Sequence, residues 1–321
     1  MRSGDAAAEH FVTLFDRNFL PAGLCLYRSL RQHAGNFRLW VLCMDTATEA
    51  RLRELALPEV RLLPLAEVET DELRSVKDGR TVGEYCWTIT PFTPKFVFDR
   101  APEARRVTYV DADVFFLDDP SRLLDELDAA DAQVLITPHA YSPEYDTSAK
   151  YGIYCVQFTT FLNSTKGREV LGWWQERCIE WCFARDEDGK FGDQKYLDDW
   201  PARFAGHVHV LAHPELALGP WNANRFVHDD AFSPVFFHFH GLRIIARDRI
   251  QLYAGYHMTP HARRFYTSYV KALSEAVDQV NRRWGEIPVL ALPTGLVARA
   301  RRMAQRIGGR IAFAECIAGR R

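Results

Sequence analysis

The chain has 321 residues, of which 47% are hydrophobic, so it can bury a large core as one big domain or as two closely joined ones. Its formal net charge of −2 provides no global basic field, and nucleic acid is not an expected partner. The seven cysteines follow neither a paired C-x-x-C zinc spacing nor the framework of a small disulfide-rich domain. Reduced thiols in the cytosol fit this usage best.

The sequence predicts a protein that crosses no membrane. The first ten residues are small and polar and lack the apolar core of a signal peptide. No uninterrupted apolar run is long enough to span a bilayer. We therefore expect a cytoplasmic protein, at most one that lies against the inner face of the plasma membrane.

The N-terminal part alternates strands and helices. Apolar runs predict strands at 11–15, 37–44 and 60–65, and helical periodicity predicts helices at 19–33 and 46–57. Such alternation is typical of a parallel sheet with right-handed crossovers, so the fold class is α/β. Ligands of these sheets gather at the carboxyl ends of strands, where Asp16 and Asp45 lie in this sequence.

The most unusual strand is at 106–116, where Asp111 and Asp113 interrupt an apolar run. Residues two apart in an extended chain project to the same side, so two like charges would crowd the end of a buried strand. A buried carboxylate is costly unless it is paired, protonated or bound to a cation. Mg²⁺ or Mn²⁺ holding phosphate oxygens resolves this conflict, whereas a solvated turn is the simpler alternative for an isolated D-x-D.

The flanking and following segments are predicted in order. Residues 83–99 are less regular, and Lys95 within them is either a surface lysine or a cation that faces a phosphate. The polar segment 138–150 is expected to be a mobile loop, and the acidic loop at 186–194 is either a solvated turn or a functional one. Further elements are expected as a helix at 120–127, strands at 133–137 and 156–161, a tryptophan-rich helix at 167–183, strands at 207–211 and 234–239, and a helix at 260–284.

A second unusual strand end follows residue 237. His238 and His240 share one face of the expected strand, and Gly241 permits a sharp turn or the close approach of a ligand. Together with Arg243, the two histidines suggest a metal or phosphate role, against the alternative that they are packing residues.

The last residues form a basic tail. Residues 288–321 follow a proline-containing linker and carry many arginines, among them Arg320 and Arg321. One helical face is expected to carry Leu296, Ala300, Met303, Ile307 and Ile311. Such a face suits an anionic membrane surface unless the tail is simply solvated. We divide the chain into a catalytic domain at 1–287 and this tail at 288–321.

Four motifs in this order make the chain resemble nucleotide-sugar glycosyltransferases of the GT-A fold. The resemblance is to glycosyltransferase family 8, which includes bacterial lipopolysaccharide galactosyltransferases and glycogenin, and covers residues 11–243. The motifs are Asp16-Arg17-Asn18-Phe19 after the first strand, Tyr109 to Asp113, Gly192-Asp193-Gln194, and His238-Phe239-His240-Gly241.

The resemblance implies a role for each matched position. Asp111 and Asp113 would coordinate Mn²⁺ or Mg²⁺ on the donor diphosphate, with His238, or alternatively His240, as the third protein ligand. Asp193 and Gln194 would flank the reacting sugar as the catalytic pair. The donor-binding residues would be Asp16, Asn18, Phe19, Lys95, Asp111, Gly241 and Arg243.

The implied function is a metal-dependent hexosyltransferase that uses a nucleotide sugar, in particular a UDP-sugar, with retention at the anomeric carbon. The acceptor would be a glycan or a lipid-linked molecule in the synthesis of a cell-surface polysaccharide or other glycoconjugate. Cys155 and Gln157 depart from the asparagine and small residues usual in the family, and Arg243 stands where a lysine-containing stretch is common. These departures keep open a non-catalytic sugar- or nucleotide-binding protein.

A sugar nucleotidyltransferase is a weaker alternative. That class needs a glycine-rich, basic loop after the first strand to hold a triphosphate. Residues 15–18 of this chain do not form such a loop.

Overall fold

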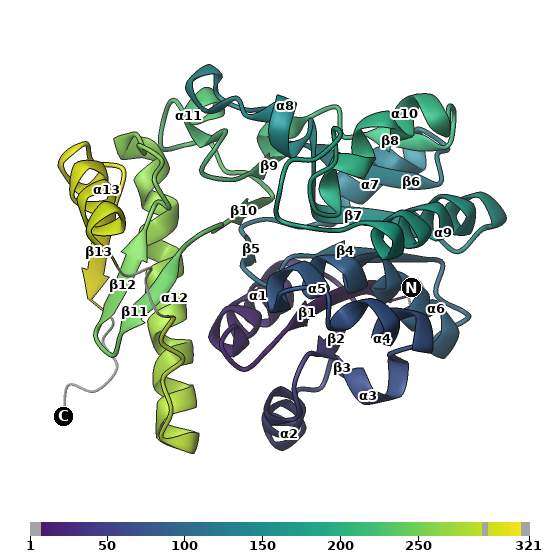
Figure 1. The fold of residues 1–321 in the computed structure, drawn as a ribbon, viewed down its shortest axis with the longest axis horizontal. Helices are drawn as coiled ribbons and strands as arrows, with labels where there is room; N and C mark the ends of the chain where they lie inside the picture. Colours follow the sequence, from purple (N-terminus) through teal and green to yellow (C-terminus); the bar gives the residue numbers. More distant parts are fainter. Residues whose placement is uncertain (1–7, 291–294, 316–321) are drawn as a thin grey trace, which may run out of the picture.

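A seven-stranded sheet forms the centre of the protein in the computed structural model, which describes residues 8–290 and 295–315 (Figure 1). β7 runs antiparallel to both of its neighbours, β4 and β6, whereas the other neighbouring strands pair in parallel. The predicted mostly parallel α/β sheet is therefore confirmed. In sheet order the strands are β3 (Val60–Pro64), β2 (Phe37–Cys43), β1 (Glu9–Phe15), β4 (Arg106–Val110), β7 (Tyr154–Leu162), β6 (Val134–Pro138) and β8 (Val208–Val210).

Helices flank this sheet and divide its apolar side chains between two hydrophobic clusters. Residues of α1 and α7 belong to one cluster, and residues of α4, α5, α6 and α9 belong to the other. The helices before residue 230 are α1 (Leu20–His33), α2 (Thr46–Leu55), α3 (Leu65–Val68), α4 (Asp71–Lys77), α5 (Val82–Ile89), α6 (Thr93–Arg100), α7 (Ser121–Ala129), α8 (Ser148–Tyr151), α9 (Thr165–Glu180), α10 (Trp200–Arg203) and α11 (Ala223–Phe226). Short 3₁₀ turns are η1 (Thr90–Phe92), η2 (Pro143–Tyr145), η3 (Gln194–Asp199) and η4 (Pro214–Leu216).

The segment 83–99 is more regular than the sequence suggested. Pro91 and Pro94 lie in the first turns of η1 and α6, where the missing N–H of proline costs no helical hydrogen bond. The prolines therefore begin new helical segments. A capping box between Thr81 and Glu84 starts the preceding helix, α5.

A small second sheet connects two segments that are far apart in the sequence. It contains β5 (Val114–Phe116), β10 (Phe236–His238) and β9 (Ala217–Leu218), with β10 in the middle. The antiparallel register places His238 opposite Val114, and the N–H of Phe239 donates to the carbonyl of Asp113 at 2.9 Å. This sheet therefore brings the second unusual strand end beside the first.

The C-terminal part adds a long helix and a third sheet (Figure 1). β13 (Ala312–Glu315) pairs with β12 (Arg249–Leu252), which pairs with β11 (Arg243–Ala246); the helices are α12 (Pro260–Trp284) and α13 (Leu296–Ile307). The described part of the basic tail is thus tied to the preceding residues by a strand pairing. The domain boundary after residue 287 stays a prediction, and Arg320 and Arg321 lie outside the described residues.

One expectation for the tail was wrong. Ile311 does not continue the apolar face of α13, because the helix ends at Ile307 and Gly309 takes a left-handed conformation with φ of 67°. Ile311 is instead buried, with 5% of its surface exposed. Across residues 8–290 and 295–315, no helix combines the length and the apolarity needed to cross a membrane.

A buried guanidinium anchors the strand that leads to Asp111. Arg106 begins β4 and is 6% exposed, and its nitrogen atoms donate to both carboxylate oxygens of Glu9 and to Asp128 at 2.6–2.9 Å. Arg105 pairs with the same Asp128, but its side chain is 60% exposed. The two neighbouring arginines thus share an anionic partner and differ in burial.

We expect Arg106→Leu to lower the free energy of unfolding by roughly 1–3 kcal/mol, because it leaves the partly buried Glu9 carboxylate without its guanidinium partner and Asp128 with the exposed Arg105 alone. Arg105→Leu, the matched control, should cost less than about 1 kcal/mol because an exposed pair contributes little. Urea unfolding of both variants measures the difference. Equal losses would contradict the role assigned to the buried pair.

Candidate active site

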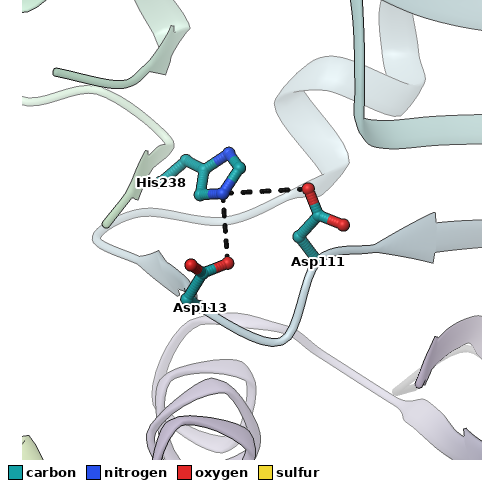
Figure 2. A group of neighbouring side chains, drawn as sticks. All are labelled: Asp111, Asp113 and His238. Carbon is teal, nitrogen blue, oxygen red and sulfur yellow. Dashed lines mark ion pairs between the residues drawn. The ribbon is translucent and has the colours of Figure 1, made fainter. Parts of the chain in front are cut away.

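Asp111 and Asp113 lie in a tight turn between β4 and β5. The N–H of Val114 donates to the carbonyl of Asp111 at 3.1 Å, which closes the turn. The sequence predicted an extended chain through the two aspartates, and the structure has a turn there instead. Their carboxylates nevertheless face the same side, since both approach one nitrogen of His238 (Figure 2).

His238 completes this group. Its Nε2 lies 3.0 Å from Oδ1 of Asp113 and 3.7 Å from Oδ2 of Asp111. Each of the three residues offers one possible ligand atom, and these three atoms lie within 4.8 Å of one another. Two carboxylate oxygens and an imidazole nitrogen fit Mn²⁺ or Mg²⁺ in chemistry and in spacing. His240 is exposed and lies beside the group, its ring centroid 5.7 Å from that of His238.

The electrostatics of the group favour a positive charge between the carboxylates. Burial alone would lower the pKa of His238, but the neighbouring Asp113 carboxylate raises it well above its usual range. Although burial opposes its ionisation, Asp113 keeps its pKa well below the usual value because His238 lies so close. Burial raises the pKa of Asp111, and the charge of Asp113 adds to that shift. A bound cation would take the place of the imidazolium charge.

A cavity of about 390 Å³ opens beside these residues. Asp111 and His238 contribute to its wall, and so do Asp193 and Gln194, the pair that the third motif identified. The structure thus brings three of the four motifs to one cavity. Aromatic side chains form much of the rest of the wall: Trp87, Tyr109, Tyr141, Tyr151, Phe191, Trp221 and Tyr256.

The chain holds Asp193 and Gln194 through their neighbours. Gly192 precedes them with φ of 53°, and a Cβ there would come within 3.3 Å of the Trp87 ring. The carbonyl of Asp193 accepts from Nε1 of Trp174 at 2.9 Å, and Nε2 of Gln194 donates to the carbonyl of Tyr151 at 2.9 Å. Burial raises the pKa of the Asp193 carboxyl to about 8, and the charge of Asp111 acts in the same direction.

The first motif adjoins Asp113 at a second, smaller pocket. Asn18 donates to both carboxylate oxygens of Asp16, through its backbone N–H at 2.9 Å and its Nδ2 at 2.8 Å. Asn18 and Phe19 line a small, mainly apolar pocket together with Asp113 and Leu242. The residues expected to hold the nucleoside therefore adjoin the candidate metal ligands.

Three remaining predicted residues differ in their placement. Gly241 has φ of 74°, and a Cβ there would come within 2.3 Å of the Cβ of Ala254, so the close packing requires glycine. Arg243 begins β11 and helps to lower the pKa of Asp113. Lys95 is exposed on α6, and its ammonium pairs with Asp99 at 2.6 Å, so the structure does not bring it to the cavity described above.

Two contacts at the site were not anticipated. The hydroxyl of Tyr109 donates to Oδ1 of Asp111 at 2.8 Å, a contact that the i, i+2 spacing on a strand could have indicated. Trp221 packs edge to face against His238 with ring centroids 5.4 Å apart. Nothing in the turn-rich sequence around Trp221 indicates that contact.

Comparisons with known proteins give a family. No protein-family model matches the chain. YfnF of Bacillus subtilis (strain 168), described as an uncharacterized protein, is 32% identical over 257 residues, which cover 75% of this chain and 84% of YfnF. The chain belongs to the same family as YfnF.

Solved structures that resemble this chain include two glycosyltransferases. The apo form of mouse xyloside xylosyltransferase 1 matches 74% of this chain and 99% of its own at 14% identity and a TM-score of 0.49. The galactosyltransferase LgtC, in complex with donor and acceptor sugar analogs, matches 72% of this chain and 87% of its own at 16% identity and a TM-score of 0.48.

The raised pKa of Asp193 predicts a pH-dependent stability. The Asp193 carboxyl has a pKa of about 8 in the folded state, against a usual value of 3.8, so between these two pH values the folded protein holds its proton. The unfolded chain binds fewer protons there, so stability falls as pH rises from about 4 to 8. We expect the free energy of unfolding of Asp193→Asn to lack this fall, which in the wild type is on the order of a few kcal/mol.

Urea unfolding at pH 5 and pH 8 in a metal chelator tests this expectation. Asp199→Asn is the control, because Asp199 is exposed and pairs with Arg203. An identical pH dependence in the wild type and in Asp193→Asn would contradict the assignment.

Proposed function

We propose that the protein is a metal-dependent glycosyltransferase that moves a hexose from a UDP-sugar to a glycan or lipid-linked acceptor. The observation that carries the proposal is that Asp111, Asp113 and His238 converge, and that Asp111 and His238 line the same cavity as Asp193 and Gln194. This combination supplies ligands for a divalent cation beside groups that can contact a sugar. Synthesis of a cell-surface polysaccharide or another glycoconjugate is the setting that we infer.

The three ligand residues would hold the cation on the donor diphosphate. A bound Mn²⁺ or Mg²⁺ would stabilise the departing nucleoside diphosphate as a Lewis acid. The residues of the chain supply the site for that charge: two carboxylates and an imidazole, with Asn18 and Phe19 adjoining Asp113 on the side where the nucleoside would bind.

The sugar would lie in the larger cavity, against Asp193 and Gln194. Nε2 of Gln194 is engaged by the carbonyl of Tyr151, so its Oε1 is the amide atom available to contact the sugar. The Asp193 carboxyl can donate a hydrogen bond when protonated and stabilise a cationic sugar when ionised. Retention at the anomeric carbon is part of the proposal because the family resemblance implies it.

Asp111→Asn tests the proposed metal site. Removing the charge while keeping the side-chain shape should lower sugar transfer by at least roughly 100-fold and should abolish metal-dependent UDP binding, because one anionic ligand is lost. Transfer and hydrolysis of UDP-sugars with Mn²⁺, together with calorimetric UDP titrations, provide the measurements.

Asp71→Asn is the matched control, because Asp71 is fully exposed on α4 and pairs only with the local Arg74 in the described structure. Unchanged turnover in a folded Asp111→Asn protein would contradict the proposal. Metal-dependent UDP binding without transfer or hydrolysis of any tested UDP-sugar would favour the non-catalytic alternative.

We also propose that α13 places the enzyme on an anionic membrane surface. Its outward face carries Ala300, Met303, Ala304 and Ile307, and Met303 and Ile307 are 63% and 79% exposed. Gln305, on the opposite side of the helix, faces Gly255. Arg301 and Arg306 flank the apolar face and would meet lipid phosphates.

The variant Met303→Ser with Ile307→Ser should lower partition onto phosphatidylserine-containing vesicles by roughly 10-fold or more, because it removes apolar area while keeping the arginines. Vesicle pelleting measures the partition. Val82→Ser is the control, since Val82 is 74% exposed on α5, away from the basic helix. Pelleting that is unchanged by the double substitution would contradict the membrane role.

A further inference from the structure

The imidazole of His238 makes a second contact on the side away from the aspartates. Its Nδ1 lies 2.9 Å from Oε1 of Gln157 on β7, while its Nε2 faces Asp113 and Asp111. Gln157 is fully buried and His238 is 4% exposed, so bulk water does not compete for this hydrogen bond. Each ring nitrogen therefore has its own environment.

This contact determines which nitrogen can bind a metal. An amide oxygen only accepts hydrogen bonds, so Nδ1 must carry the hydrogen in the pair with Oε1 of Gln157. A neutral imidazole with its hydrogen on Nδ1 has its lone pair on Nε2, the nitrogen that points at the two carboxylates. Partners of this kind fix the tautomer and the ring orientation of histidines that bind metals.

Gln157 also holds the backbone of a second member of the group. Its carbonyl accepts from the N–H of Asp111 at 3.2 Å, next to the antiparallel pairing of Phe158 with Val110. The main chain of one residue thus positions Asp111, and its side chain positions His238. Substitution of the side chain leaves the main-chain contact in place.

The fold gains little from this glutamine. Nε2 of Gln157 is buried without a hydrogen-bond partner among the described residues. A buried, unpaired donor costs stability, on the order of 1–3 kcal/mol. An apolar side chain of similar size would avoid that cost, so the amide is better explained by what its oxygen does.

We propose that Gln157 is a positioning residue that keeps the hydrogen of His238 on Nδ1 and thereby keeps Nε2 free to bind the divalent cation. This inference rests on the proposed function and deepens it. The glutamine that departs from the usual family pattern would be part of how this chain builds its metal site.

Mn²⁺ binding in the presence of UDP, followed by electron paramagnetic resonance of free Mn²⁺, tests the proposal without reference to turnover. Gln157→Leu should weaken Mn²⁺ binding by roughly 10- to 100-fold. The melting temperature of this variant without metal should stay close to that of the wild type, because the removal of the unpaired Nε2 offsets the loss of the acceptor for Nδ1–H. Gln157→Glu retains an acceptor for Nδ1–H and should restore Mn²⁺ affinity. Thr159→Val, on the same strand, removes a buried hydroxyl that bonds only the local Val156 carbonyl in the described structure, and should leave Mn²⁺ affinity unchanged.

The outcomes separate this inference from the proposed function. Wild-type protein that binds no Mn²⁺ with UDP would overturn both. Wild-type binding with equal affinity in folded Gln157→Leu would overturn the role of Gln157 alone, as would equal weakening by Gln157→Leu and Gln157→Glu. If Gln157→Leu fails to fold, ring ¹⁵N shifts of wild-type His238 with Mg²⁺ and UDP decide: a hydrogen on Nδ1 supports the proposal, and a hydrogen on Nε2 overturns it.

Discussion

The antiparallel pairing of β10 with β5 is the contact on which the candidate site depends. It sets His238 opposite Val114 and beside Asp113, residues that are far apart in the sequence. Three buried or half-buried ionisable groups then share a small volume, an arrangement that is costly unless their charges compensate one another. The imidazolium of His238 compensates the carboxylates in this structure, and a divalent cation held by the same atoms would do so more completely. The local fold is thus consistent with a site built for positive charge.

The sheet and the edge at which the candidate site residues lie were largely predictable from the sequence. Strongly apolar runs such as 37–43 leave little choice but a buried strand, and alternating helices favour parallel pairing. Parallel strands end at a common edge of the sheet, so Asp16 and Asp111 were expected at the same edge. The parallel pairing of β1 with β4 agrees with this. The same logic placed Asp113 at the end of β4 in an extended chain, whereas the structure has a tight turn there.

Long-range contacts account for what the sequence could not provide. The choice between His238 and His240 depends on the register of β10 against β5, which no local pattern encodes. Gln157 was recognisable only as an unusual residue on a strand, because its contact with His238 crosses from one sheet to another. The prediction that segment 83–99 is irregular was wrong for a different reason. Its prolines lie in first helical turns, where proline is compatible with a helix.

Anomalous diffraction from crystals grown with Mn²⁺ and UDP tests the central claim most directly. We predict one manganese peak bound by carboxylate oxygens of Asp111 and Asp113 and by Nε2 of His238, each at about 2.0–2.3 Å, with the diphosphate on its open side. UDP bound in the pocket without manganese at these three residues, or manganese held elsewhere, would contradict it.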